Sequence, residues 1–299
     1  NDRQDGHELW LKVVNRYKVL QIETPLFYYR QHGASLSTDR TQLLAARAKI
    51  KRALVERAAG AVAPTIVAVV GAKNSYADMP NVVLNPIAGR PLIAYTLDAA
   101  LAVPTLDMVT VSTDDQAVVD YCAAHYPSVV ARVRPPELSS LLVSESDLLR
   151  DSVGAVEEMD RWPDIVVSLG VHTPLRTAEQ VQKAIDTLLL YDIDSVISVH
   201  EDQDLYYVHG KRGLEPLNPS MHRQVRVERE ALFAGNGAVR ALWRDLLDEP
   251  EAFRPKVGHI VMPRQNGLHI KSAHDAWLAE QLLTERATGR PLRPESWQA

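Results

Sequence analysis

The sequence has little cysteine, no long apolar run and no excess of positive charge. Its 299 residues include one cysteine, Cys122, which excludes an intrachain disulfide and a cluster of thiolate metal ligands. No apolar run approaches the roughly 18 residues of a membrane span. The formal net charge of −5 gives no electrostatic reason to expect nucleic acid or an anionic membrane as a partner. From these absences we expect a cytoplasmic protein without an integral membrane segment.

The residues that are present predict a folded protein. The chain is 46% hydrophobic and 24% charged, which suits one large core or two smaller ones. Cys122 lies in VVDYCAAHY, on the apolar face of a predicted helix, and we expect a buried, unreactive thiol. Because the first residue is Asn rather than Met, we expect the chain to be part of a longer protein.

The first 37 residues are too few to bury a core of their own. An acidic motif precedes a Leu-Trp-Leu helix there, and a YYRQHGASLS segment follows. These strings resemble the C-terminal end of inverting family 2 glycosyltransferases, and the resemblance places Asp5 at the position of that family's catalytic base. Read from the residues alone, Asp5 caps the helix that begins near Glu8. We expect residues 1–37 to be the C-terminal remnant of a glycosyltransferase-like domain.

Residues 38–63 predict a helical linker. Leu43, Ala46, Ile50 and Leu54 form an apolar stripe at helical spacing, and Arg and Lys occupy much of the remaining surface. Such a pattern predicts a helix whose basic face is solvated, connecting two domains. The segment from Gly60 to Pro64 ends the helix and marks the domain boundary.

From residue 64 onward, strand and helix patterns alternate. This alternation predicts an α/β fold of three layers with a mainly parallel sheet, and ligands at the carboxyl ends of its strands. Residues 205–234 predict a small hairpin arm with extended segments at residues 205–208 and 225–227, and residues 288–299 predict a tail. The predicted strands cover residues 66–70, 108–112, 165–169, 195–199 and 259–262, and the predicted helices residues 91–102, 115–125, 147–160, 177–188, 238–247 and 274–287.

Several strings in residues 64–287 resemble, in order, those of the acylneuraminate cytidylyltransferases, the CMP-sialic acid synthetase family. They are NPIAGRPLIAYT, VSTDD, RPPEL, TPLRTAE, DSVISV, NGA and VMP. The resemblance implies a nucleotide-diphospho-sugar transferase (Rossmann-like) fold with three α/β/α layers. It also implies a nucleotidyltransferase activity that converts CTP and an acylneuraminate-type sugar acid into a CMP-sugar and pyrophosphate.

The same resemblance implies a Mg²⁺ cofactor, a homodimer held through the hairpin region between residues 205 and 234, and two sets of site residues. The nucleotide, CTP or CMP, would be bound by Lys73, Asn74, Ser75 and Ser112. The sugar acid would be bound by His172, Arg176, Arg223, Gln224 and Asn236.

The sequence departs from the family where the phosphates and the metal would bind. The family's A-R-G-G-S-K-G-x-P-x-K-N loop, whose glycines and basic residues hold the triphosphate, reads AKNSYADMPNVV here, so both of the glycines after the first basic residue are lost. The family's two metal-binding aspartates are His269 and Lys271. Imidazole is a poor ligand for Mg²⁺ and an ammonium group is no ligand, so we predict that the Mg²⁺ ligands are absent. Leu141 replaces a further family aspartate.

Two functions remain open on the sequence alone. The first is a cytidylyltransferase-like domain attached to a glycosyltransferase and used in surface polysaccharide or glycoconjugate biosynthesis. The second is a catalytically silent sugar- or nucleotide-binding domain that supports the upstream glycosyltransferase, because a fold can be kept while its site residues are lost. Binding of CTP with and without Mg²⁺, together with pyrophosphate release, distinguishes the two.

Overall fold

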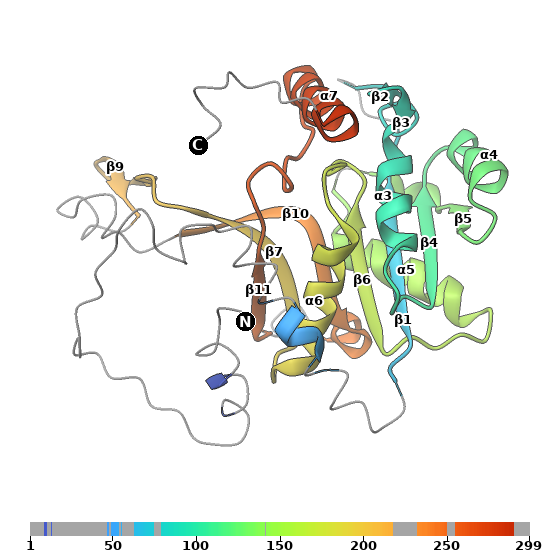
Figure 1. Ribbon diagram of the computed structural model, residues 1–299, viewed down its shortest axis with the longest axis horizontal. Coiled ribbons are helices and arrows are strands. Elements are labelled where there is room, and N and C mark those ends of the chain that lie inside the picture. The colour runs from blue at the N-terminus through green and yellow to red at the C-terminus, as the bar shows by residue number, and fades with distance from the viewer. Residues whose placement is uncertain are drawn as a thin grey trace.

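The computed structural model describes residues 63–74, 79–140, 142–217, 232–249 and 255–289, together with residues 9, 10, 13, 47, 49–53 and 55. Within these residues the chain forms one sheet of seven strands and two small hairpins (Figure 1). The seven strands are β1 (Ile66–Ala72), β4 (Met108–Thr113), β5 (Val130–Val133), β6 (Ile165–Gly170), β7 (Ser195–Asp202), β10 (Leu232–Trp243) and β11 (Val257–Val261).

The sheet is mainly parallel. Its strand order is β11-β7-β10-β6-β1-β4-β5, and β10 alone of these seven described strands runs antiparallel to its neighbours, β6 and β7. Parallel strands need crossover connections, and helices of the described chain supply them. These helices are α3 (Leu92–Leu101), α4 (Gln116–His125), α5 (Glu145–Glu157) and α6 (Ala178–Leu190), followed by α7 (Ala273–Thr288) near the end of the described residues.

Local sequence signals set where the helices begin. Asp115, directly after β4, accepts a hydrogen bond from the backbone of Ala117 and so caps α4. Thr177 and Gln180 form a capping box at the start of α6. Ser272 caps α7 by accepting a hydrogen bond from the backbone of Asp275. Each of these helices therefore starts within a few residues of the position that the sequence predicts.

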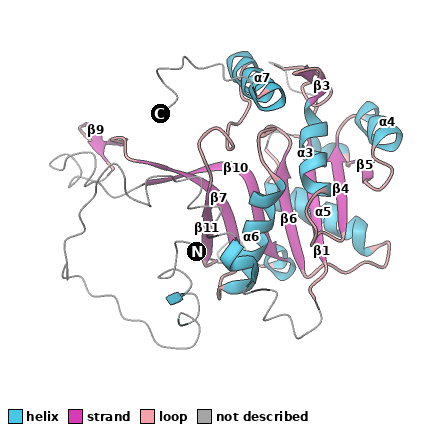
Figure 2. Ribbon diagram, viewed as in Figure 1, coloured by secondary structure: helices cyan, strands magenta, loops and turns pink. Residues whose placement is uncertain are grey.

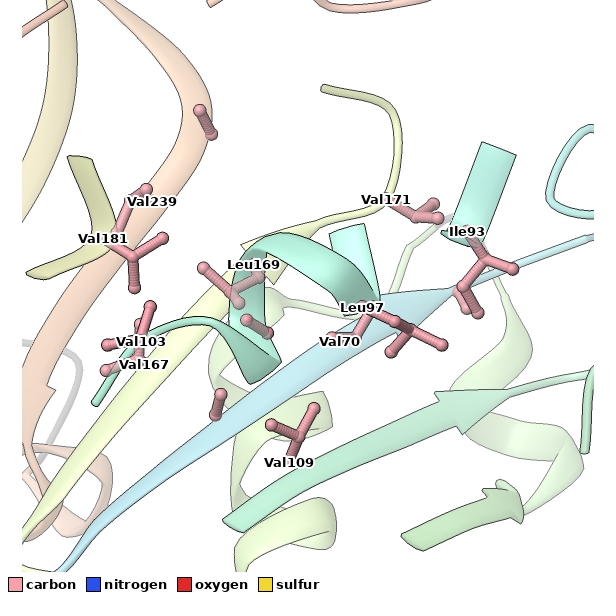
Figure 3. Close-up of a cluster of buried hydrophobic side chains, with 14 of the residues drawn as sticks. Val70, Ile93, Leu97, Val103, Val109, Val167, Leu169, Val171, Val181 and Val239 are labelled. Carbon is pink, nitrogen blue, oxygen red and sulfur yellow. The ribbon is translucent and has the colours of Figure 1, made fainter. Parts of the chain in front are cut away.

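The core lies on both faces of the sheet, as alternation along a strand requires. Ile66, Ala68 and Val70 of β1 face a large apolar cluster that includes α3 and α6, whereas Val69 faces a second cluster with α5. Figure 3 shows Val70 and Leu97 among the side chains of the larger cluster. Figure 2 shows helices on either side of the strands. The predicted three-layer α/β fold is confirmed.

One predicted helix is wrong. Residues 238–247 form the second half of β10 and then a 3₁₀ turn, η4 (Arg244–Asp248), instead of a helix. The strand is buried between β6 and β7, so its inner residues lose the apolar–polar alternation that identifies a half-buried strand. The spacing of Ala238, Ala241 and Leu242 then imitates a helical face. Strand β5, which has four residues, was not predicted from the sequence.

A hairpin arm is present, and its first strand begins two residues later than the predicted segment at residues 205–208, whereas the predicted second segment, residues 225–227, lies outside the described residues. β8 (Tyr207–Gly210) pairs antiparallel with β9 (Gly213–Pro216), and this hairpin follows β7. In Figure 1 it lies at the end of the molecule opposite α4 and β5. A second hairpin, β2 (Pro86–Ile87) with β3 (Arg90–Pro91), precedes α3. Part of the predicted arm, residues 218–231, lies outside the described residues.

The described residues between 47 and 55 are helical and contact α6. The Lys51 ammonium donates a 2.9 Å hydrogen bond to the hydroxyl of Thr187, and Arg52 forms a 3.1 Å ion pair with Asp186. Lys51 is only 7% exposed. The prediction of a solvated basic face is therefore wrong at Lys51, because α6 offers buried polar partners that the local sequence cannot reveal.

Candidate functional site

The candidate site lies where three parallel strands end. Ala72, Thr113 and Gly170 close β1, β4 and β6, which are adjacent in the sheet. Parallel strands present their carboxyl ends at one edge, and the loops that follow them meet there. An irregularity in β10 between Gly235 and Arg240 lies beside the end of β6, since the carbonyl of Gly237 closely approaches Gly170.

Asn74 organises the loop that leaves β1. Its backbone N–H donates to the Asp114 carboxylate at 2.6 Å, and its side-chain amide donates to Asp115 at 2.7 Å. Its side-chain oxygen accepts a 3.0 Å hydrogen bond from the backbone of Val83. Asn74 is 2% exposed, so these contacts are buried and fix the loop against the end of β4.

Lys73 and Ser112, two further nucleotide-binding candidates, lie close to the same strand ends. The Lys73 ammonium donates to the carbonyl oxygen of Ser139, which follows β5. Ser112 is 1% exposed within β4, and its hydroxyl has no hydrogen-bond partner among the described residues. Ser75, the fourth nucleotide-binding candidate, lies outside the described residues.

Arg176 joins the turn after β6 to β10. One of its terminal nitrogens donates to the carbonyl of Gly170 at 3.0 Å, the hydroxyl of Thr173 at 2.9 Å and the carbonyl of Ala238 at 2.6 Å. The side chain is 2% exposed, and burial lowers the pKa of the guanidinium to about 9. Its contacts hold the turn that carries His172 in place, so Arg176 orders the site from inside the protein.

Asn236 performs a similar role in the β10 irregularity. Its side-chain oxygen accepts hydrogen bonds from the Ser198 hydroxyl at 2.5 Å and from the backbone of Ala238 at 3.1 Å. The next residue, Gly237, has a φ of 65°, a conformation that glycine adopts without strain. Asn236 and Gly237 therefore shape the backbone that lies beside the end of β6.

His172 and His269 form the most unusual feature of the site. Their rings are nearly parallel, with an interplanar angle of 8° and 5.7 Å between centroids. The loops that carry them are tied together, since the backbone of Ile270 donates to the carbonyl of His172 at 2.9 Å. Burial, and then the neighbouring His269, lower the pKa of His172 to about 4. Burial and the charge of Lys271 also lower the pKa of His269.

Lys271 and Asp275 lie at the start of α7, beside the histidine pair. The backbone of Lys271 donates to the Asp275 carboxylate at 3.1 Å, and the Ser272 hydroxyl donates to it at 2.8 Å. These hydrogen bonds, that of Ser272 first, lower the pKa of Asp275. The negative charge of Asp275 in turn opposes the lowering of the His269 pKa. The Asp275 carboxylate thus engages one oxygen, Oδ2, in the first turn of α7.

The donor set does not fit Mg²⁺. The two positions that the resemblance assigns to metal ligands hold an imidazole, His269, and an ammonium group, Lys271. Mg²⁺ requires hard oxygen ligands in octahedral geometry. Among the described residues, no group of three or more His, Cys, Asp or Glu is placed to hold a metal ion. The side chains present here therefore provide no carboxylate cage for the ion.

Several candidates fall outside the described residues: the proposed glycosyltransferase base Asp5, Leu141, and the sugar-acid candidates Arg223 and Gln224. Sequence reasoning also missed a role that the structure gives to Asp114 and Asp115, which hold Asn74 and cap α4. The signal was present, because two consecutive aspartates follow directly after a predicted strand.

Comparison with solved structures defines the class of fold. CMP:2-keto-3-deoxy-manno-octonic acid synthetase, solved in complex with CTP, matches with a TM-score of 0.56 and 17% identity, over 74% of this chain and 99% of that one. A 4-diphosphocytidyl-2C-methyl-D-erythritol synthase from Anaerococcus prevotii matches with a TM-score of 0.55 and 14% identity, over 75% of this chain and 100% of that one. The α/β fold of this chain is therefore similar to the folds of these two synthases.

Sequence comparison identifies a smaller group of similar proteins than the comparison of folds does. Residues 77–213 match the model of the cytidylyltransferase family, so this part of the chain is similar to that family. The N-acylneuraminate cytidylyltransferase of Streptococcus agalactiae serotype III is 29% identical over 137 residues, which cover 45% of this chain and 32% of that protein. This chain thus spans only a minor part of that relative. The pseudaminic acid cytidylyltransferase of Campylobacter jejuni is 22% identical over 210 residues, 65% of this chain and 85% of that protein.

Of the helices within the described ranges, none has the length and apolar character needed to cross a membrane.

Cys122 is buried, as predicted, and burial raises the pKa of its thiol to about 11. A thiol with so high a pKa is almost entirely protonated at neutral pH and is a weak nucleophile.

Proposed function

We propose that residues 64–287 bind a cytidine nucleotide and a sugar acid, as a domain of the CMP-sugar acid synthetase type. The observation that carries the proposal is the convergence of the β1, β4 and β6 ends on one edge, with Asn74 fixing the first loop against Asp114 and Asp115. The match of residues 77–213 to the cytidylyltransferase family supports the same assignment. A cytoplasmic domain that supplies activated sugar acids would fit this chemistry.

The proposed contacts with ligand divide into two groups. Lys73, Ser75 and Ser112 lie in or next to the segments that would face the nucleotide phosphates, and His172, Arg223 and Gln224 would face the sugar acid. Asn74, Arg176 and Asn236 instead act as positioning residues, because their polar atoms hold loops together inside the protein. The charge of Lys73 would attract phosphate, although an ammonium group cannot donate the two parallel hydrogen bonds of an arginine guanidinium.

The larger protein is proposed to join this domain to a glycosyltransferase. The support is the resemblance of residues 1–37, with Asp5 as a base candidate, to the end of such a domain. A transferase joined to a domain that handles CMP-activated sugars suits the synthesis of surface polysaccharide or glycoconjugate. We further propose a homodimer in which the β8–β9 hairpin contributes to the interface.

A second candidate is a domain that binds its ligands without catalysing transfer. The observation that favours it is the donor set at His269 and Lys271, which offers no oxygen ligand for Mg²⁺. Cytidylyl transfer depends mainly on electrostatic stabilisation of the phosphoryl group, so loss of the metal removes a large part of that stabilisation.

Calorimetric titration of the full chain with CTP tests the proposal, with UTP as the matched control ligand. We expect CTP to bind at least tenfold more tightly than UTP, a difference of about 1.4 kcal/mol. Pyrophosphate release in the presence of N-acetylneuraminate then separates the two candidates, since only an active synthetase releases it. Equal binding of CTP and UTP, or no binding of either to the folded protein, contradicts the proposed function.

A further inference from the structure

The strand-end site contains two half-buried imidazoles, His172 and His269, and His269 and Lys271 occupy the positions of the family's two metal-binding carboxylates. His172 and His269 stack with 5.7 Å between ring centroids, and they come from loops almost a hundred residues apart that are joined by the Ile270–His172 backbone hydrogen bond. Lys271 acts electrostatically on His269. On His269 the charges of Lys271 and Asp275 act with opposite signs, and a hydrogen bond with the Asn236 backbone favours its charged form; the charge that acts on His172 is that of His269.

This arrangement suits an anion better than a cation. A protonated imidazole donates from both ring nitrogens, and Lys271 adds a positive charge nearby. The Asp275 carboxylate accepts hydrogen bonds from the Ser272 hydroxyl and the Lys271 backbone at one of its oxygens, Oδ2. An incoming oxyanion would thus meet the donors of a protonated imidazole and the positive charge of Lys271, whereas a divalent cation would find no oxygen ligand at His269 or Lys271.

We propose that His172, His269 and Lys271 hold an oxyanion group of the ligand directly, without a divalent metal ion, and that one imidazole takes up a proton as the anion binds. The oxyanion belongs either to the phosphates of the nucleotide or to the carboxylate of the sugar acid. The inference rests on the proposed function for the identity of these ligands. It goes beyond that function in assigning the residues, the absence of a metal requirement and the coupling to a proton.

The protonation behaviour of the pair supports this coupling. In the absence of ligand, burial keeps both rings neutral near pH 7, since the pKa of His172 is about 4 and that of His269 is also lowered. A bound anion favours the charged form of an adjacent imidazole and raises its pKa. The two rings are close enough that protonation of one disfavours protonation of the other. One proton per anion is therefore the expected stoichiometry.

The test is calorimetric titration of the full chain with CTP and, in a separate arm, with N-acetylneuraminate, at pH 7.5 and pH 5.5, in EDTA or in excess Mg²⁺. For at least one ligand we expect an affinity that Mg²⁺ changes by less than about twofold and that rises about tenfold at the lower pH, as linkage to protonation requires. The ligand whose affinity behaves in this way is the one that supplies the oxyanion.

Substitutions of the two histidines and of Lys271 identify the side chain that takes up the proton when the anion binds. We expect His172→Gln and His269→Gln to lose the gain in affinity at pH 5.5, while Lys271→Gln weakens binding at both pH values and keeps the gain. His125→Gln is the matched control, because His125 is an exposed histidine at the end of α4. Comparison with the His125→Gln control also removes the contribution that protonation of CTP itself makes to the pH dependence of binding.

Proton uptake by the wild-type chain provides a measurement that needs no variant. Titration with N-acetylneuraminate near pH 6 in two buffers of different ionisation enthalpy should reveal uptake approaching about one proton per ligand bound. If CTP is the ligand that shows the pH effect, the same titration is made with CTP on the wild-type chain and on a folded His172→Gln variant. The difference in proton uptake between the two then gives the number of protons that the protein takes up per ligand bound.

The experiments distinguish a failure of this inference from a failure of the proposed function. Binding that requires Mg²⁺, or a gain at low pH that survives in both folded histidine variants, overturns this inference and leaves the proposed function standing. Metal-free, proton-coupled binding of the sugar acid without any binding of CTP supports the inference and overturns the nucleotide part of the proposed function. Binding of neither ligand overturns both.

Discussion

Asn74, Arg176 and Asn236 are polar residues at the strand ends whose polar atoms are used within the protein. The sequence predicts that such residues lie near the site, because each falls just after a strand or within a short polar motif. It does not predict their partners, since Asp115 lies 41 residues after Asn74 and Ala238 lies 62 residues after Arg176. Whether a polar residue contacts ligand or supports a loop depends on the tertiary structure.

Asn74→Ala tests this supporting role. The change leaves the backbone N–H of Val83 and the Asp115 carboxylate without their buried amide partner, and we expect the free energy of unfolding to fall by about 2 kcal/mol. Urea denaturation measures the difference. Asn85→Ala is the matched control, because Asn85 is exposed and its change should cost less than about 0.5 kcal/mol. Equal losses in the two variants would contradict the assigned role.

At the level of elements, the sequence predicts most of what the structure contains. β1, β4, β6 and β7 are rich in β-branched residues, and the helices α4, α5 and α6 have side-chain caps, so local signals locate these strands and helices. β10 could not be predicted because its burial between β6 and β7 removes the alternation on which a strand prediction depends. The position of the helix at residues 47–55 depends on Thr187 and Asp186, more than 130 residues later.

The contact of that helix with α6 should make stability depend on pH. Burial lowers the pKa of Lys51 from 10.5 to about 8, so between these values the unfolded chain binds more protons than the folded one. The contribution of Lys51 to stability is therefore highest above pH 10.5, falls as the pH decreases to about 8, and is constant below that. The expected total change is about 3 kcal/mol.

Lys51→Met removes this contribution. We expect the free energy of unfolding of the variant to rise less between pH 7.5 and pH 10 than that of the wild type, as measured by urea denaturation at both values. Lys49→Met provides the control, since Lys49 is exposed on the same helix. A variant whose stability follows the same pH dependence as the wild type would show that Lys51 is not the group responsible.

At the level of the whole molecule, the β8–β9 hairpin extends from β7 on the side of the molecule opposite α4 (Figure 1). Its side chains include large apolar ones in contact with solvent: Tyr207, Val208 and Leu214. Exposed apolar groups gathered on a projecting hairpin are typical of an interaction surface. We propose a second copy of this chain as the partner, as the family resemblance also implies.

Leu214→Asp tests the dimer. Leu214 is 66% exposed, and burial of a leucine at an interface contributes about 1.5–3 kcal/mol, so the dissociation constant should rise at least tenfold. Light scattering coupled to size-exclusion chromatography measures the molar mass over a range of concentrations. Leu142→Asp is the control, because Leu142 is an exposed leucine in a loop away from the hairpin. A monomeric wild type, or a dimer that Leu214→Asp leaves intact, contradicts the proposal.

The place of β10 in the sheet has a consequence for how the chain folds. β6 and β7 are consecutive strands, yet they touch only through β10, which is synthesised later. Until residues 232–243 have emerged from the ribosome, the nascent chain has two exposed strand edges and an incomplete sheet. The family match at residues 77–213 contains neither β10 nor β1, and both are central strands. A fragment with those limits would therefore lack both strands that connect β6 to the rest of the sheet, and we expect it to aggregate instead of folding.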